Sequence, residues 1–401
     1  MARTERFATV AVLVLVSLPV HAQSIAVKPD SIRLAGGRYV ADLTNGGHAE
    51  LTLDPRLQAS TEDVLRTFQI PYAGAVVVSV PDGRVLALVG RSAADPRLGP
   101  ADLAVRPWAP SASVFKVVSA TALVESGNSG ATRVCYHGGV SAVLPDNLID
   151  IPAIDRRCDT LAFGIGKSQN AIVAKLVTQH LTAGDIAREG RRFGFGETIP
   201  FEIPVEPSHL DVPVDRLEMA RASAGFWHST LSPLHGALVA ATIANGGEMP
   251  APTLIESAVD AEGRPEPLAV AATRHVADGA AAAAVGRMME LTTRIGTAKK
   301  TFRNKHGQRY LPVEVAGKTG TLAADTDRGP IGYSWFVGYA PADHPAIAFA
   351  VVLGNGPNWR IKATYVGRNI VATYLAGKAA SGLERGLVAA RQPAHSRHRV
   401  N

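Results

Sequence analysis

Three short strings follow one another along the chain, and together they constrain its fold more than any other feature. They are Ser113-Val114-Phe115-Lys116, Ser168-Gln169-Asn170 and Lys318-Thr319-Gly320-Thr321. A Ser-x-x-Lys arises by chance about once in a chain of this length, so a single match has little meaning. The ordered set supplies a serine nucleophile with a nearby lysine, a Ser-x-Asn element and a Lys-Thr-Gly strand, which one acyl-transfer mechanism needs together. We therefore expect a fold that brings three distant segments into one site.

The first string is predicted to begin a helix. Pro110 and Ser111 precede it, and apolar residues follow at helical spacing, with neither Gly nor Pro until Gly127. A serine in the first turn lies at the positive end of the helix dipole. Lys116 lies one turn after Ser113 on the same face. The alternative is a surface helix with an incidental Ser and Lys, and the other two strings argue against it.

Lys116 must be deprotonated before it can accept the proton of Ser113. The ordinary pKa of a lysine is about 10.4, and lowering it to about 7 requires about 4 kcal/mol of differential stabilisation. Burial beside a second cation can supply this free energy, and Lys318 is the candidate for that cation. Lys116 as the base is a hypothesis, because the identity of the base is disputed for enzymes with these motifs.

The second and third strings are weak when taken singly. A Ser-x-Asn is usually a turn or a helix cap, and this one lies between an apolar, Gly-rich stretch over 161–166 and a helical run over 171–180. The third string follows a predicted strand over 311–316, and another strand is predicted over 333–339. Both strings are informative only because they occur in this order and together with the first string.

The three strings and their surroundings resemble the transpeptidase domain of the penicillin-binding proteins, over about residues 51–376. Further segments carry the resemblance: Leu51-Thr52-Leu53-Asp54-Pro55-Arg56-Leu57-Gln58, Ala224-Gly225-Phe226, Leu231-Ser232-Pro233-Leu234, Gly296-Thr297-Ala298 and Tyr333-Ser334-Trp335-Phe336-Val337-Gly338. The resemblance implies an α/β fold of the penicillin-binding transpeptidase and β-lactamase type. A central antiparallel sheet would be flanked by helices, and a mostly helical lobe would carry the second string.

The resemblance also implies roles for the residues of the first two strings. Ser113 would be the nucleophile. Ser168 would relay a proton toward the leaving amine, while Asn170 would hold Lys116 and a substrate amide carbonyl. These residues, with Lys318, form the expected catalytic set.

The third string would bind the other end of the substrate. A backbone N–H after the small Gly320 is well placed to form half of an oxyanion hole, with the N–H of Ser113 as the other half. In the family the residue at Thr321 donates it. The hydroxyls of Thr319 and Thr321 would take the terminal carboxylate of the substrate.

The substrate implied is a peptidoglycan stem peptide ending in D-Ala-D-Ala. Ser113 would attack the penultimate carbonyl, D-Ala would leave, and the acyl group would pass to an amine on a neighbouring strand. β-Lactam antibiotics would be covalent inhibitors, and no cofactor is expected. The resemblance leaves the acceptor amine and any cell-wall synthesis partners open.

Other outcomes of the same chemistry remain as alternatives. Water instead of the amine would make the protein a D,D-carboxypeptidase. Rapid lactam hydrolysis would make it a β-lactamase, but no Glu-x-x-Leu-Asn string follows Ser168, and Asn170 stands where the other serine lactamase type has an apolar residue. A β-lactam-binding sensor that is acylated without turnover is a further alternative. We expect such a sensor to carry a membrane segment or a signalling domain.

The sequence does not support two competing motifs. Gly166-Lys167-Ser168 and Gly317-Lys318-Thr319 resemble the end of a phosphate-binding loop, which needs a glycine five residues before the Gly-Lys pair. The chain has Leu161 and Pro312 there. It also lacks the Gly-x-Ser-x-Gly elbow of Ser-His-Asp hydrolases.

Most of the formal net charge of +6 lies at the two ends of the chain. Residues 1–22 contribute +1 and residues 391–401 contribute +3. The nearly neutral remainder offers no electrostatic footprint for nucleic acid, so we expect no nucleic-acid partner.

The first residues resemble a secretory signal peptide. Arg3 and Arg6 precede an apolar run over 7–20, and Val20-His21-Ala22 offers a cleavage site before Gln23. The run is shorter than the roughly 20 residues that a membrane-spanning helix needs. We predict a cleaved signal peptide and a periplasmic or extracytoplasmic location, with an uncleaved membrane anchor as the alternative.

Cys135 and Cys158 are the only two cysteines. In an exported protein we expect them to form a disulfide, which would stabilise the fold by about 3 kcal/mol. Two separate buried thiols are the alternative. No His pair at ligand spacing accompanies them, so we expect no metal site.

These features divide the chain into four expected segments. They are a signal peptide over 1–22, a short N-terminal β segment over 23–50, a transpeptidase domain over 51–380 and a basic, disordered tail over 381–401. The short second segment leads us to expect a transpeptidase domain that stands alone, without a glycosyltransferase domain before it.

Overall fold

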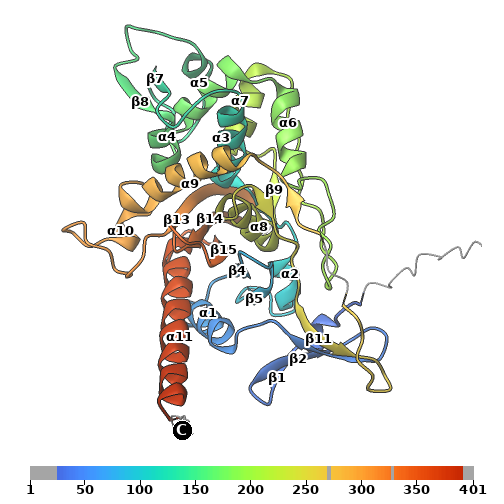
Figure 1. Ribbon diagram of the computed structural model, residues 1–401. Coiled ribbons are helices and arrows are strands. Elements are labelled where there is room, and N and C mark those ends of the chain that lie inside the picture. Colours follow the sequence, from blue (N-terminus) through green and yellow to red (C-terminus); the bar gives the residue numbers. More distant parts are fainter. Residues whose placement is uncertain (1–24, 269–271, 327–328, 392–401) are drawn as a thin grey trace, which may run out of the picture.

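The centre of the molecule is a five-stranded antiparallel sheet built from both halves of the chain (Figure 1). Its spatial order is β13 (Ala316–Thr326), β14 (Gly329–Ala340), β15 (Ile347–Asn355), β4 (Tyr72–Ser79) and β5 (Val85–Arg91). Every residue of β15 is buried, and its β-branched and aromatic side chains suit a strand covered on both faces. The predicted central antiparallel sheet is confirmed.

The computed structural model describes residues 25–268, 272–326 and 329–391. The predicted signal peptide over 1–22 and the last ten residues of the expected tail lie outside the described residues.

Helices cover both faces of the central sheet. On one face α8 (Pro233–Ala244) packs against β4, β14 and β15, and on the other face lie α1 (Pro55–Thr67) and α11 (Ala363–Arg391). Asp54 directly precedes helix α1 and caps it, because its side chain accepts two backbone N–H bonds. This packing leaves β13 as an edge strand, next to the helical lobe.

The helical lobe lies above the sheet in Figure 1. It contains α3 (Lys116–Glu125), α4 (Leu161–Lys167), α5 (Asn170–His180), α6 (Ala183–Arg192), α7 (Arg216–Ala224) and α9 (Gly279–Arg294). Helix α9 contacts both α4 and β13, so it holds the second string in place relative to the third.

The expected N-terminal β segment is part of a larger sheet. Strands β1 (Arg33–Ala35), β2 (Arg38–Asp42) and β3 (His48–Leu51) are joined by β11 (Ile255–Val259), which pairs with β3. Strands β2 and β3 pair with each other in antiparallel orientation, within the expected β segment and one residue beyond it. The contribution of β11, about 200 residues later in the sequence, was not predicted.

The prediction of a strand over 311–316 is wrong. Strand β13 begins only at Ala316, so the third string lies inside the strand and does not follow one. Leu311 and Val315 are buried in the core beneath the sheet, and Pro312 between them has no N–H to donate to a ladder. Their apolar character therefore reflects packing and not strand pairing.

At the C-terminal end, α11 continues to Arg391. It therefore runs past residue 380, where the tail was expected to begin.

The remaining elements are short. They are η1 (Pro29–Ser31), α2 (Pro100–Ala104), β6 (Ala109–Pro110), η2 (Ala112–Phe115), β7 (Arg133–Tyr136), η3 (Pro145–Leu148), β8 (Arg157–Thr160), β9 (Thr230–Leu231), β10 (Glu248–Met249), β12 (Arg274–His275) and α10 (Lys299–Phe302). A disulfide joins Cys135 of β7 to Cys158 of β8.

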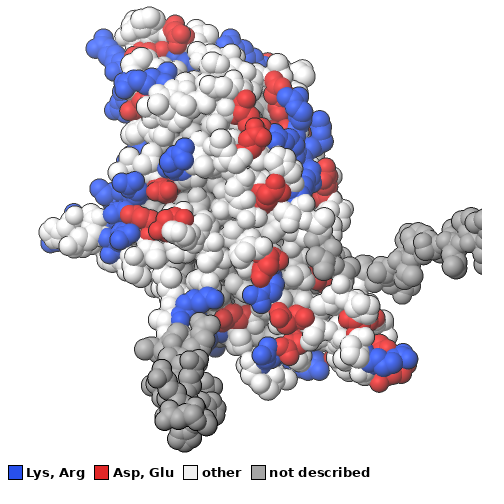
Figure 2. All heavy atoms as spheres, viewed as in Figure 1, with Lys and Arg blue, Asp and Glu red and all other residues white. Residues whose placement is uncertain are grey.

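Basic and acidic side chains are interspersed over the face seen in Figure 2. Within the described ranges, none of the helices combines the length and the apolar character that crossing a membrane requires.

Candidate active site

Ser113 lies in the 3-10 turn η2, directly before α3. The predicted helix therefore starts as a tighter turn, and Lys116 is the first residue of the α-helix itself. The Lys116 Nζ lies 2.6 Å from the Ser113 Oγ. Val114 and Phe115 between them are buried, so packing holds the turn in place.

Lys116 is fully buried and its amine has three oxygen neighbours. Besides Ser113, the Nζ lies 2.6 Å from the Asn170 Oδ1 and 2.7 Å from the carbonyl oxygen of Ala224. Burial lowers the pKa of Lys116 well below its ordinary value, and the positive charge of Lys318 lowers it further. The expected causes are both present, with burial the larger.

The second string lies where the chain turns from α4 into α5. Ser168 has a φ of +56°, and Asn170 is the first residue of α5. The Asn170 Nδ2 donates to the carbonyl of Val140 at 3.0 Å. Asn170 is thereby held between Lys116 and the loop that follows β7.

Lys318 connects the second and third strings. Its Nζ donates to the Ser168 Oγ at 2.8 Å and to the carbonyl of Thr319 at 2.8 Å. Burial lowers the pKa of Lys318 to about 7. Ser168 therefore has a partner able to supply or take a proton near neutral pH.

The third string passes directly beside the nucleophile turn. A Cβ on Gly320 would lie 3.1 Å from the Cβ of Ala112 and 3.1 Å from that of Trp335, so only a very small residue fits comfortably. Thr321 is exposed, and the Thr319 hydroxyl lies 2.6 Å from the Thr297 hydroxyl. The hydroxyls therefore lie in the accessible part of the site.

The structure brings all the predicted site residues together. Ser113, Ser168, Asn170, Thr319, Gly320 and Thr321 line one cleft of about 940 Å³, and the Lys116 and Lys318 amines contact its serines. The described residues that line it include Lys167, Lys300 and Lys362 but no Asp or Glu. Such a cleft suits a ligand with an anionic end.

Sequence reasoning missed three contributors to the site. The Ala224 carbonyl contacts Lys116, and Gly225 follows it with a φ of +92°. A Cβ on Gly225 would lie 1.9 Å from the carbonyl oxygen of Ala112, so the loop can approach the nucleophile turn only with glycine there. The third contributor is Thr297, and all three residues were noted only as parts of matching segments. In the sequence only Gly225 offered a signal, because a glycine often stands where a helix ends and the chain turns.

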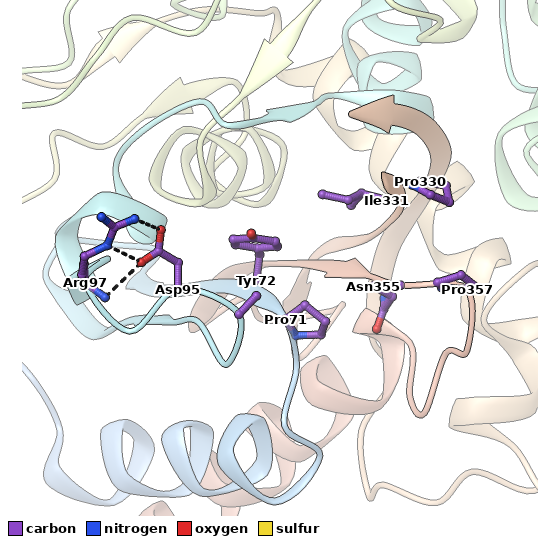
Figure 3. A pocket seen from close by; sticks show the side chains of 10 residues that line it. Pro71, Tyr72, Asp95, Arg97, Pro330, Ile331, Asn355 and Pro357 are labelled. Atoms are coloured by element: carbon purple, nitrogen blue, oxygen red, sulfur yellow. Dashed lines mark hydrogen bonds and ion pairs between the residues drawn. The ribbon is translucent and has the colours of Figure 1, made fainter. Parts of the chain in front are cut away.

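A second cavity of about 410 Å³ lies where β4 begins and β15 ends (Figure 3). In Figure 3 the Asp95–Arg97 ion pair stands at one side of this cavity, with Tyr72 between it and Asn355. Ile331 of β14 also lines this cavity. None of the three strings reaches this cavity, so we do not assign the chemistry to it.

No group of three or more His, Cys, Asp or Glu residues able to hold a metal ion occurs within residues 25–268, 272–326 and 329–391.

Several known proteins resemble this chain in sequence and in structure. A model of the penicillin binding protein transpeptidase domain matches residues 73–372. The peptidoglycan D,D-transpeptidase PbpA of Mycobacterium tuberculosis is 29% identical over 388 residues, covering 85% of this chain and 76% of that protein. PbpA of Mycolicibacterium smegmatis is 27% identical over 367 residues, covering 82% of this chain and 72% of that protein. The imipenem acyl-enzyme complex of penicillin-binding protein A from M. tuberculosis has a TM-score of 0.69 at 23% identity, covering 82% of this chain and 80% of that one, which shows a common fold.

Proposed function

The chain belongs to the penicillin-binding protein transpeptidase family, and from this membership and the geometry of the cleft we propose a D,D-transpeptidase that works through an acyl-enzyme on Ser113. Its substrates are peptidoglycan stem peptides that end in D-Ala-D-Ala. The observation that carries the proposal is the buried Lys116 amine, 2.6 Å from the Ser113 hydroxyl, with a lowered pKa.

In the acylation step the neutral Lys116 amine takes the proton of Ser113 while the Oγ attacks the penultimate carbonyl carbon. The negative charge that develops on the carbonyl oxygen is stabilised by the backbone N–H groups of Ser113 and Thr321. The peptide C–N bond then breaks. Its nitrogen leaves as the amine of D-Ala, protonated through Ser168, whose hydroxyl is held by Lys318.

In the second step an acceptor amine attacks the Ser113 ester, the ester C–O bond breaks, and the proton that the amine gives up returns to the Ser113 Oγ. The Thr319 and Thr321 hydroxyls bind the terminal carboxylate of the donor, near the three lysines at the rim of the cleft. β-Lactams acylate the same serine and act as covalent inhibitors.

Labelling with a fluorescent penicillin tests this function. The protein from Gln23 onward is expected to give a stable adduct that Ser113→Ala abolishes and that persists through a chase with unlabelled drug. No adduct on folded wild-type protein would refute the acyl-enzyme, and rapid loss of the adduct would indicate a β-lactamase. A donor peptide offered with and without an acceptor amine separates cross-linking from D,D-carboxypeptidase hydrolysis.

We also propose that the protein is exported, with residues 1–22 acting as a cleaved signal peptide. The apolar run after Arg3 and Arg6 and the Cys135–Cys158 disulfide both support an oxidising location outside the cytosol. Mass spectrometry of the protein from cell fractions is expected to find an N-terminus at Gln23. Retention of Met1 in the mature protein would contradict cleavage.

A further inference from the structure

Trp227 has a backbone conformation that its residue type disfavours. It lies on the loop after α7, has a φ of +58° and is 57% exposed. Bulky residues rarely adopt a positive φ, and an exposed indole leaves apolar surface in water. Strained residues that persist in a fold tend to lie at catalytic sites and ligand clamps. Trp227 lines the cleft, so its strained and exposed position marks it as a candidate contact for a ligand.

The loop ties Trp227 to the catalytic groups. The carbonyl of Ala224, three residues earlier, lies 2.7 Å from the Lys116 amine. On the other side of Trp227, the N–H of His228 donates to the carbonyl of Phe226 at 2.7 Å. Because both flanks are held, the backbone of Trp227 has a fixed place relative to the nucleophile.

The lining of the cleft is chemically mixed. Trp227, Phe226 and Val140 supply apolar surface, and Val140 is 79% exposed. The Val140 carbonyl accepts from Asn170, so the backbone there is fixed to the second string. The lining also includes the hydroxyl and ammonium groups of Thr297, Thr319, Thr321, Lys300 and Lys362 and the apolar side chains of Leu322, Ala323, Trp335 and Trp359. Trp227 lies on the loop after α7, whereas Thr319 and Thr321 belong to β13, and both segments contact the η2 turn that holds Ser113.

We propose that Trp227 determines specificity for the acyl donor, by packing against an apolar group on the N-terminal side of the bond that Ser113 attacks. The carboxylate end of the donor binds at the Thr319 and Thr321 hydroxyls of β13, so the acyl portion extends past Ser113 toward the loop that carries Trp227. The ligand class is an acyl group with an apolar or aromatic side chain. This inference rests on the proposed function, because it assigns the two ends of the same substrate.

Two penicillins that differ by one phenyl group provide the test. Benzylpenicillin and 6-acetamidopenicillanic acid share the bicyclic nucleus, the carboxylate and the side-chain amide. The second-order acylation constant is measured for both with wild type, Trp227→Gly and Trp227→Phe. Trp227→Gly is expected to lower the ratio of the two constants about tenfold, the loss of one aromatic contact. Trp227→Phe, which keeps a ring, is expected to retain most of the ratio.

The controls separate this inference from the function beneath it. Leu34→Ala changes a residue of similar exposure, 56%, on the distant strand β1, and is expected to leave the ratio unchanged. Glycine accepts a positive φ, so Trp227→Gly is expected to fold with an undiminished melting temperature. An unchanged ratio in Trp227→Gly, or an equal fall in Leu34→Ala, would overturn the role of Trp227. Failure of both penicillins to acylate wild type would instead refute the proposed function.

Discussion

Lys116 and Lys318 are buried without any ion pair to a carboxylate among the described residues. A charged ammonium in such a place is costly, so both amines are displaced toward the neutral form. A neutral amine is what a base beside Ser113 requires. Burial of these amines therefore lowers the stability of the fold, but it also favours the neutral form of Lys116 that the reaction needs.

Replacement of Lys116 tests its role as the base. Lys116→Met keeps the length of the side chain but removes the amine, so acylation by benzylpenicillin is expected to fall about a thousandfold. Lys116→Arg is expected to be equally inactive, because a guanidinium stays charged. Stopped-flow acylation rates and a melting curve for each variant check this. Retention of a tenth or more of the wild-type rate in a folded Lys116→Met would exclude the lysine as the base.

Lys318 should make the stability of the protein depend on pH. Its pKa is about 7 in the folded protein, and the unfolded chain has the ordinary lysine value near 10.4. Between these values the unfolded chain binds more protons, so the free energy of unfolding rises with pH from about 7 to about 10, by at most about 4 kcal/mol. Lys318→Met is expected to flatten this rise in denaturant titrations. Identical slopes in wild type and variant would show that Lys318 is charged when buried.

At the scale of elements, the site depends on the close approach of three backbone segments. The η2 turn with Ser113 meets the loop after α7 on one side and β13 on the other. Gly225 and Gly320 occur at these two contacts. A side chain at either point would move the nucleophile away from Lys116.

Gly225→Ala tests the importance of this approach. The φ of +92° and the contact of a Cβ with the Ala112 carbonyl are together expected to cost about 2 to 4 kcal/mol of unfolding free energy and to slow acylation. Gly127→Ala is the matched control, because Gly127 has a φ of +95° and open space around it. It is expected to cost only about 1 to 2 kcal/mol and to acylate normally. Equal losses in the two variants would mean that the contact with Ala112 is unimportant.

At the scale of the whole molecule, the N-terminal residues are part of the same folded unit as the rest. Strand β3 pairs with β11, the N–H of Val27 donates to the carbonyl of Glu202, and the Thr52 hydroxyl donates to the Val85 carbonyl. Val27 and Leu43 are buried in the main core. Contacts of this range make the segment a stabilising part of the fold.

Removal of residues 1–50 is therefore expected to lower the melting temperature by several degrees and to expose the edge of β11. The protein that begins at Gln23 is the matched control, because it keeps all of β1, β2 and β3. Differential scanning calorimetry and gel filtration check stability and aggregation. An unchanged melting temperature would show that the segment is an independent appendage.

The sequence by itself identified the groups that meet in the candidate site. The Ser113–Lys116 spacing follows from the period of a helix, and it holds even though the first turn is of the 3-10 type. The order of the three strings indicated one cleft, and the family resemblance that they carry implied the antiparallel sheet. These inferences succeed because they depend on residue type and local periodicity.

Only the tertiary structure decided what surrounds those residues. The Ala224 carbonyl has no sequence signature, because every residue has a carbonyl, and only the packing of α7 brings it to Lys116. The exposure of Trp227 in the cleft and the pairing of β11 with β3 depend on segments far apart in the sequence. The lowered pKa of Lys116 likewise arises from burial by α5, α7 and β13 together. Local patterns specify which groups are present, whereas distances and burial come from long-range packing.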